Sequence, residues 1–145
     1  MHISMKVDYG VRAMIDLAQH SDEGPVQTAD IAARQNVPEP YLDQIMTTLN
    51  KYGFIRSRRG PQGGHVLARP PEETTLQAII TTLEGNLAPV ECLNEPAVCT
   101  LSHNCSQREV WRSVEEAVQS VLSSTSIADL ANRQKQLASS GMYQI

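Results

Sequence analysis

Residues 27–69 constrain the fold of this chain more than any other stretch. They contain a short helical pattern at 28–34, a turn at Asn36 and Pro38, and a longer helical pattern at 41–51. Two brief strand-like runs follow, placed around a glycine-rich hairpin. This order of elements is that of a winged helix-turn-helix, in which the second helix of the pair enters the major groove of DNA.

The charge pattern of this stretch supports the same interpretation. Residues 44–71 contain five Lys or Arg residues and no Asp or Glu, although the whole chain has a formal net charge of -4. An acid-free basic segment in an acidic chain is typical of a surface that meets phosphate. The basic residues are Lys51, Arg56, Arg58, Arg59 and Arg69.

Two segments supply the candidate DNA contacts. In the longer helical pattern, Leu42, Ile45, Met46 and Leu49 form an apolar stripe, and the polar residues of its first two turns face away from that stripe. The hairpin has a polar, basic tip, and its glycines let the backbone approach another surface closely. From the two segments and the start of the preceding helix, we expect DNA contacts from Thr28, Tyr41, Asp43, Gln44, Arg58, Arg59, Gly64 and His65.

Further helices are predicted on both sides of this module. Apolar residues at helical spacing indicate helices at 8–19, 74–83 and 110–122, and Thr28 is expected to cap the helix that follows it. The stripe at 110–122 is long for a chain of 145 residues, which favours packing against a second subunit. Ser126 and Asp129 resemble a further helix start, and residues 134–145 are only weakly patterned.

These patterns together predict a mainly α fold. We expect a winged helix-turn-helix with a small two-stranded wing, followed by a long C-terminal dimerisation helix. The expected division is a DNA-binding domain at 1–72 and a cysteine-loop and dimerisation region at 73–145. No run approaches the roughly 18 apolar residues of a membrane span, and the start of the chain does not resemble an export signal, so we expect a cytoplasmic protein without a membrane partner.

Three cysteines lie within fourteen residues of a polar, proline-broken loop. Cys92, Cys99 and Cys105 are odd in number, which argues against a closed disulfide framework. Clustered thiolates select zinc, copper(I) or iron–sulfur clusters, and these intervals are longer than the pairs of most structural zinc sites. The spacing therefore leaves three alternatives open: an iron–sulfur cluster, a zinc ion, or a thiol switch without a ligand.

A cluster would need a fourth ligand in addition to the three thiolates. His103 is nearest in sequence, between two of the cysteines, and Asp8 lies far away at the start of the first predicted helix. The remaining candidates are His65, Glu91 and Glu95.

At this point the residues resemble the Rrf-two family of bacterial transcriptional regulators. The resemblance covers essentially the whole chain. It rests on YGVRAM at 9–14, GPVQTADIA at 24–32, YLDQI at 41–45, RGPQGGHVL at 59–67, the three cysteines, and Trp111-Arg112 at the start of the long helix.

The resemblance implies a homodimeric winged-helix regulator that binds a double-stranded DNA operator and is paired by its long helix. In cluster-binding members, the three cysteines hold a two-iron, two-sulfide (2Fe–2S) cluster. One branch adds a histidine three residues after the last cysteine, where this chain has Arg108. The nitric-oxide-sensitive branch uses an aspartate from the first helix of the partner subunit, and Asp8 matches that position. The resemblance thus implies Asp8 as the fourth ligand, with His103 second.

The leading hypothesis is a transcriptional regulator that senses redox state, nitric oxide or iron–sulfur status through this cluster. A metal-free repressor controlled by its thiols or by a partner protein is the alternative within the same class. A cluster-carrying electron-transfer protein would leave the basic hairpin unexplained. We expect no enzymatic activity, because no nucleophile triad, phosphate loop or paired acid and base stands out.

Overall fold

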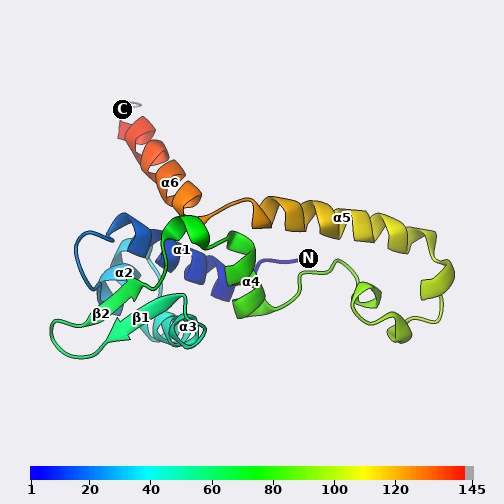
Figure 1. Cartoon of the computed structure of the whole chain (residues 1–145), viewed down its shortest axis with the longest axis horizontal. Helices are drawn as coiled ribbons and strands as arrows, with labels where there is room; N and C mark the ends of the chain where they lie inside the picture. The colour runs from blue at the N-terminus through cyan, green and yellow to red at the C-terminus, as the bar shows by residue number, and fades with distance from the viewer. Residues whose placement is uncertain (143–145) are drawn as a thin grey trace.

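The computed structural model describes residues 1–142, so the last three residues of the weakly patterned tail lie outside the described part. Six α-helices and a two-stranded antiparallel sheet make up the described chain, which confirms the mainly α winged-helix fold (Figure 1). The helices are α1 (Met5–Gln19), α2 (Thr28–Gln35), α3 (Glu39–Lys51), α4 (Leu76–Glu84), α5 (Ser106–Ser123) and α6 (Ile127–Met142). The strands are β1 (Ile55–Arg58) and β2 (Gly64–Leu67).

Helices α2 and α3 form the helix-turn-helix that the sequence predicts. Asn36 ends α2 in the left-handed conformation, with φ 55°, and its N–H donates to the carbonyl of Ala32. Pro38 precedes α3, and Pro40 lies in its first turn, where no backbone N–H is needed for the helix. Leu42, Ile45, Met46 and Leu49 are all buried, which confirms the apolar stripe.

One expectation about α2 is wrong. Thr28 does not cap the helix: the N-cap residue is Gln27, and no side chain caps this end of α2. The Thr28 hydroxyl lies instead 2.7 Å from Nε2 of His65, on the second strand of the wing. A hydroxyl can bond either its own helix or a neighbouring element, and here the strand holds it.

The core of the winged helix extends beyond residue 72. Ile79, Ile80 and Leu83 of α4 and Ile127 of α6 are buried in the same apolar cluster as α1 and α3. The starts of α4 and α6 are joined by backbone hydrogen bonds, from Leu76 N–H to the Thr125 carbonyl and from Ile127 N–H to the Thr74 carbonyl. Helix α6 begins as the sequence indicates, since Ser126 and Asp129 cap each other's N–H groups.

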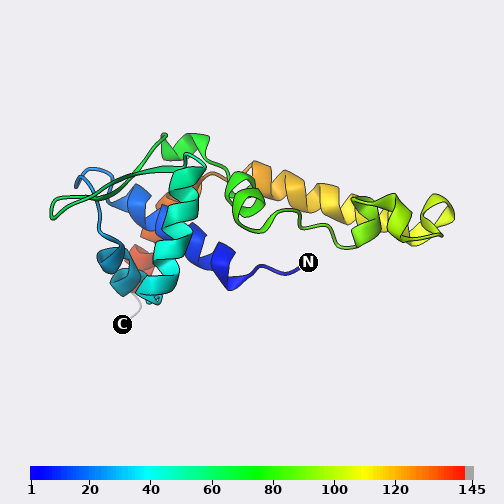
Figure 2. The same cartoon turned by 90° about the horizontal axis from the view of Figure 1, so that it is seen from below.

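Helix α5 differs from the other α-helices of the described chain because it has no buried residue. Figures 1 and 2 show that α5 extends away from the body formed by α1–α4 and the wing, and that the cysteine loop lies beside its outer part and around its far end. Val110 and Val121 are 59% and 64% exposed. The helix therefore keeps an apolar stripe that its own chain does not cover.

A buried carboxylate fastens α2 to α1. Asp16 of α1 is 0% exposed and accepts from Arg34 Nη2 at 2.8 Å, from Arg34 Nε at 3.0 Å and from Gln35 Nε2 at 3.0 Å. Its charge is thus matched by a bidentate guanidinium, the arrangement that a buried carboxylate requires.

Replacing Asp16 with asparagine is expected to lower the free energy of unfolding by about 1–2 kcal/mol, because charge-assisted hydrogen bonds are stronger than neutral ones. Urea denaturation measures the change. Asp22→Asn is the control, because this carboxylate lies in the exposed turn after α1 and has no ion pair in the described chain. Equal stabilities of the two variants would contradict the role of Asp16.

Candidate nucleic-acid interface and cysteine loop

The first two turns of α3 present the residues that were expected to read DNA. Asp43 and Gln44 are exposed, as is Thr47, whose hydroxyl donates to the Asp43 carbonyl at 2.8 Å. Tyr41 is only partly exposed, because its ring packs edge-on against Tyr9 of α1, with centroids 5.7 Å apart. The side chains of Asp43 and Gln44 are thus accessible to DNA, whereas Tyr41 is held against α1.

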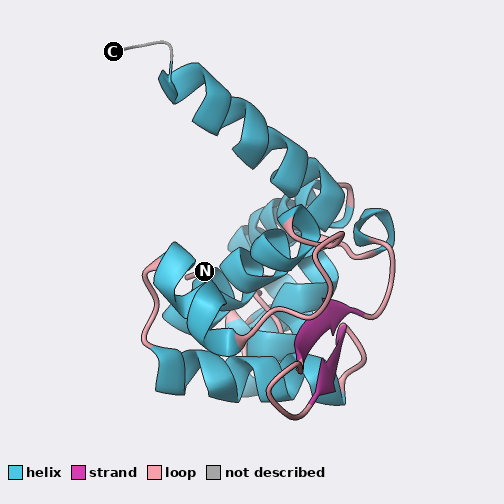
Figure 3. Cartoon of the chain, turned by 90° about the vertical axis from the view of Figure 1, so that its left-hand side faces the viewer, coloured by secondary structure: helices cyan, strands magenta, loops and turns pink. Residues whose placement is uncertain are grey.

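The wing ends in a basic turn. Arg58 and Arg59 are exposed, and in residues 1–142 neither forms an ion pair with a carboxylate. Strands β1 and β2 pair from Ile55 with Leu67 to Arg58 with Gly64, so Arg58 ends the ladder and Arg59 begins the turn. Figure 3 shows the two strands at one edge of the helical body. The guanidinium groups are therefore available to a phosphate or a base edge.

His65 lies at the base of the wing, where the wing meets α2. Its Nε2 is 2.7 Å from the Thr28 hydroxyl, and its Nδ1 is 2.7 Å from the Ser57 hydroxyl of β1. Its backbone exchanges two hydrogen bonds with Val26, of 2.8 and 3.0 Å. Both ring nitrogens are engaged, so His65 offers no free lone pair to a metal in this arrangement. Sequence reasoning missed Ser57, although hairpin pairing places it opposite His65.

Burial lowers the pKa of His65 below its ordinary value of 6.5, and the nearby Asp43 carboxylate partly opposes this effect. A histidine with a lowered pKa binds fewer protons in the folded than in the unfolded chain. Its contribution to stability is therefore complete above the unfolded pKa and is lost as pH falls through the folded pKa.

We accordingly expect the free energy of unfolding to decrease as pH falls from 7 towards 5, and His65→Gln to remove part of this dependence. Urea denaturation at several pH values, with His103→Gln as the exposed control, measures the difference. Identical pH profiles for the wild type and His65→Gln would contradict the assignment.

The cysteine loop between α4 and α5 is a series of three short 3-10 turns at Glu91–Leu93, Pro96–Val98 and Ser102–Asn104. Cys92, Cys99 and Cys105 are free thiols and partly exposed. Arg108 of α5 donates from Nη2 and Nε to the Cys92 carbonyl, at 3.2 and 3.3 Å, and so ties the first turn to the helix. Sequence reasoning identified Arg108 only as a missing histidine, since nothing in the spacing indicated this backbone contact.

The two leading candidates for the fourth ligand, His103 and Asp8, lie in different parts of the chain. His103 lines a polar hollow of about 440 Å³ at the start of α5, together with Cys105 and Arg108. Asp8 lies on α1 and forms an ion pair with Arg12 at 3.0 Å. Arg12 also donates to the Gln35 carbonyl at the end of α2, at 3.2 Å.

The cysteine loop and the candidate fourth ligands differ in how well their chemistry and their arrangement suit a metal group. The three partly exposed thiols match the donors that iron–sulfur clusters use. However, no group of three or more His, Cys, Asp or Glu side chains among residues 1–142 is close enough together to hold a metal ion. The three thiols are therefore suitable donors for an iron–sulfur cluster, but in the single chain they do not form a preformed metal site.

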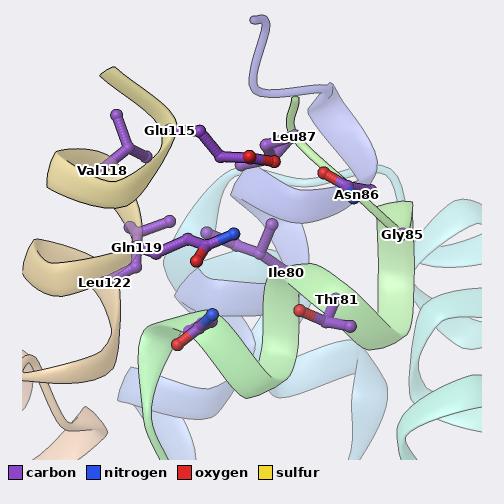
Figure 4. Close-up of a pocket in the computed structure, with 10 residues that line it drawn as sticks. Ile80, Thr81, Gly85, Asn86, Leu87, Glu115, Val118, Gln119 and Leu122 are labelled. Carbon is purple, nitrogen blue, oxygen red and sulfur yellow. The ribbon is translucent and has the colours of Figure 1, made fainter. Parts of the chain in front are cut away.

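A second hollow, of about 280 Å³, separates α4 from α5. Its apolar lining comes from Ile80, Leu87, Val118 and Leu122, and Glu115 and Gln119 of α5 add polar side chains to the lining (Figure 4). The hollow lies on the side of α5 that faces α4, and Val110 and Val121 do not line it. In the described part of the chain, no helix is long and apolar enough to cross a membrane.

Comparison with known proteins identifies the family. The model of the Rrf2 family, described as an iron-dependent transcriptional regulator, matches residues 3–133. The transcriptional regulator IscR of Serratia proteamaculans is 35% identical over 134 residues, which cover 92% of this chain and 81% of IscR. The transcriptional regulator CymR of Bacillus subtilis is 41% identical over 134 residues, which cover 91% of each protein.

The solved structure of B. subtilis CymR, the global cysteine regulator, superposes with a TM-score of 0.78 at 39% identity, over 92% of this chain and 98% of CymR. These relatives are transcriptional regulators and not enzymes, as the sequence predicts. The chain belongs to the Rrf2 family of transcriptional regulators.

Proposed function

We propose that this regulator binds its operator as a homodimer through α3 and the wing, and that its cysteine loop senses redox state, nitric oxide or iron–sulfur status through a 2Fe–2S cluster. The observation that carries the DNA-binding part is the pairing of an exposed α3 face with an acid-free wing, in which Arg58 and Arg59 form no ion pair within the described chain. A regulator of this kind would act in the cytoplasm, where operators are.

The proposed contacts divide by type. Asp43 and Gln44 are suited to base edges, because a carboxylate accepts from cytosine and an amide bonds adenine bidentately. Arg58 and Arg59 are suited to phosphate or to the minor groove. Tyr41, Thr28 and His65 have partners inside the protein, so their contribution would come through the placement of α3 and the wing. Residues 1–72 would thus supply the DNA-contacting surface, with α4 and α6 completing its core.

The proposed dimer contact is the apolar stripe of α5. Four apolar residues of this stripe recur at intervals of four, three and four residues, the spacing found along the seam of a two-helix coiled coil. They are Val110, Val114, Ala117 and Val121. The far end of α5 carries the cysteine loop, and its near end joins the body. For Asp8 of the partner subunit to approach the loop, the two helices would have to run antiparallel.

The proposed cluster ligands are Cys92, Cys99, Cys105 and Asp8 of the partner subunit, with His103 as the second choice for the fourth position. A bound cluster would supply a centre that reacts with oxidants and with nitric oxide. In the isolated chain, Asp8 is held by Arg12, and Arg12 in turn holds the end of α2. If Asp8 bound a cluster, Arg12 would lose its carboxylate partner.

A metal-free regulator controlled by its thiols or by a partner protein is the second candidate. The three free thiols are not close enough together in the described chain to hold a metal ion, which favours the metal-free regulator. One relative of this chain, CymR of B. subtilis, carries the description of global cysteine regulator. The two candidates share the DNA-binding surface and differ in metal content.

The test begins with protein purified without oxygen, followed by its visible absorption spectrum and assays of iron and acid-labile sulfide. A brown protein with about equal iron and sulfide supports the cluster, and Asp8→Ala and His103→Ala then distinguish the fourth ligand. A colourless protein without iron after attempted reconstitution removes the cluster and leaves the thiol-controlled candidate. Selection of a binding sequence from a random duplex library tests DNA binding independently of both.

Replacing Arg59 with alanine is expected to weaken binding to the selected duplex by about 1–3 kcal/mol if the side chain reads a base. If it contacts phosphate, the loss should be similar for every sequence, and the salt dependence should decrease by about one unit. Fluorescence anisotropy at several salt concentrations separates the two results. Arg133→Ala, on the exposed face of α6, is the control. Unchanged binding by Arg59→Ala would contradict the proposed wing contact.

A further inference from the structure

The base of the wing carries a contact that the proposed DNA-binding function does not yet use. His65 lies between two hydroxyl groups from different elements, Thr28 of α2 and Ser57 of β1, each 2.7 Å from a ring nitrogen. A nearby contact joins the residue before α2 to the turn of the wing, since Nε2 of Gln27 donates to the Gly63 carbonyl at 2.8 Å. The imidazole ring of His65 therefore helps to hold the wing in its position against the helix-turn-helix.

We propose that His65 is a proton-coupled positioning residue, which holds the wing against α2 through Thr28 and Ser57 and gains a proton when DNA binds. This inference rests on the proposed DNA-binding function. It assigns His65 a role distinct from a direct contact with a base, because neither ring nitrogen is free to reach one in this arrangement.

The hydrogen-bond inventory explains why a proton can be added without loss of a contact. A neutral imidazole has one N–H and one lone pair, so one of the two hydroxyls must donate its proton to the ring. An imidazolium has two N–H groups, and both hydroxyls can then accept. Protonation thus keeps both contacts, and the hydroxyl that had donated to the ring can turn its O–H towards another acceptor, such as a phosphate oxygen.

The groups around His65 determine whether DNA binding favours the protonated or the neutral form of its ring. Asp43 of α3 is the charged group that acts on the ring, and it favours the protonated form, whereas partial burial favours the neutral form. His20, which follows α1, lines the small hollow beside the bridge between Val26 and His65, and Arg56 and Arg58 lie on either side of Ser57 on β1. DNA phosphates near the wing would add negative potential, and negative charge nearby stabilises the imidazolium.

Thermodynamic linkage turns this into a measurable result. If the DNA-bound protein holds one more proton, affinity rises as pH falls between the pKa values of the free and bound forms, by at most tenfold per pH unit. We expect binding of the selected duplex at constant salt to become about fivefold tighter between pH 7.5 and 6.0. His65→Gln, which keeps a polar group near Thr28 but does not titrate, should change by less than about twofold over the same range.

The experiment measures fluorescence anisotropy of the duplex selected by the wild-type protein, at pH 7.5 and 6.0, for the wild type, His65→Gln and His20→Gln. His20 is the matched control because it is a second partly buried histidine near the wing, bonded to Asp16 of α1. The expected result is a pH effect in the wild type and His20→Gln that is lost in His65→Gln. An unchanged pH effect in His65→Gln, or no pH effect in the wild type, would overturn the proposal.

A second measurement keeps the proposal testable if His65→Gln folds poorly. Nitrogen-15 spectra of the histidine side chains report the protonation of each ring, and the four histidines can be assigned with single variants. In the wild type, the pKa of His65 should rise when the duplex is added, and the others should change less. An unchanged His65 pKa would overturn the proposal, whereas a wild-type protein that selects no sequence and binds no duplex would instead refute the proposed function.

Discussion

If the proposed dimer forms through α5, replacing Val114 with aspartate is expected to give a monomer and to weaken operator binding by about 10²–10⁴-fold, the range by which linking two binding modules exceeds a single one. Val114 lies beside the midpoint of α5, which spans Ser106–Ser123. In a symmetric antiparallel pair, the two copies of this residue meet close to the two-fold axis. The variant would therefore bring two carboxylates together in an apolar seam, where both charges lose hydration.

Sedimentation velocity gives the oligomeric state, and fluorescence anisotropy with the selected duplex gives the affinity. Ser123→Asp is the matched control, because it places the same charge on the same helix but away from the stripe of Val110, Val114, Ala117 and Val121. It should remain a dimer. A dimeric Val114→Asp with normal affinity would exclude this seam as the interface.

Replacing Gly64 with alanine is expected to lower the free energy of unfolding by about 2–4 kcal/mol, through backbone strain and overpacking together. Gly64 has φ 138°, a conformation that L side chains rarely adopt. An added Cβ would lie 2.6–2.9 Å from the backbone O, C and N atoms of Val26. Backbone atoms cannot move aside as a side chain can, so the bridge that joins the wing to the segment before α2 would have to open.

Gly60→Ala provides the control within the same wing. Gly60 also has a positive φ, of 104°, but no atom lies within 4 Å of its added Cβ. This variant should lose only the strain component, about 1 kcal/mol. Urea denaturation compares the two variants, and similar losses in both would show that contact with Val26 does not determine the cost at Gly64.

Gly64 also illustrates a change of role between sequence and structure. The sequence indicated glycines that let the wing approach another surface, and DNA was the expected surface. In the structure, the close approach at Gly64 is to the backbone of Val26 in the same chain. Thr28 and His65 are likewise engaged with each other. The pattern of a single sequence shows that a residue is polar or can adopt a positive φ, but it does not show which partner the residue contacts in the folded chain.

The helices were predictable because their signals are local. The apolar spacing in α3, the prolines before it, the glycine after α4 and the reciprocal Ser126–Asp129 cap all act within a few residues. The start of α1 was expected at Asp8 but is at Met5, since the hydroxyl of Ser4 accepts from the Val7 N–H and extends the helix by most of a turn. Helix α4 begins at Leu76 rather than at Thr74, because Thr75 caps it.

The sequence by itself thus determined the winged helix-turn-helix, the basic wing, the long apolar helix and the clustering of three cysteines in one loop. Only the tertiary structure decided which groups lie together across the chain: His65 between Thr28 and Ser57, Asp16 beneath Arg34, and Arg108 on the Cys92 carbonyl. The physical reason is one of range. Propensity, capping and periodicity operate over a few residues, whereas these contacts join elements that are 8 to 37 residues apart and form only when the core has brought them together.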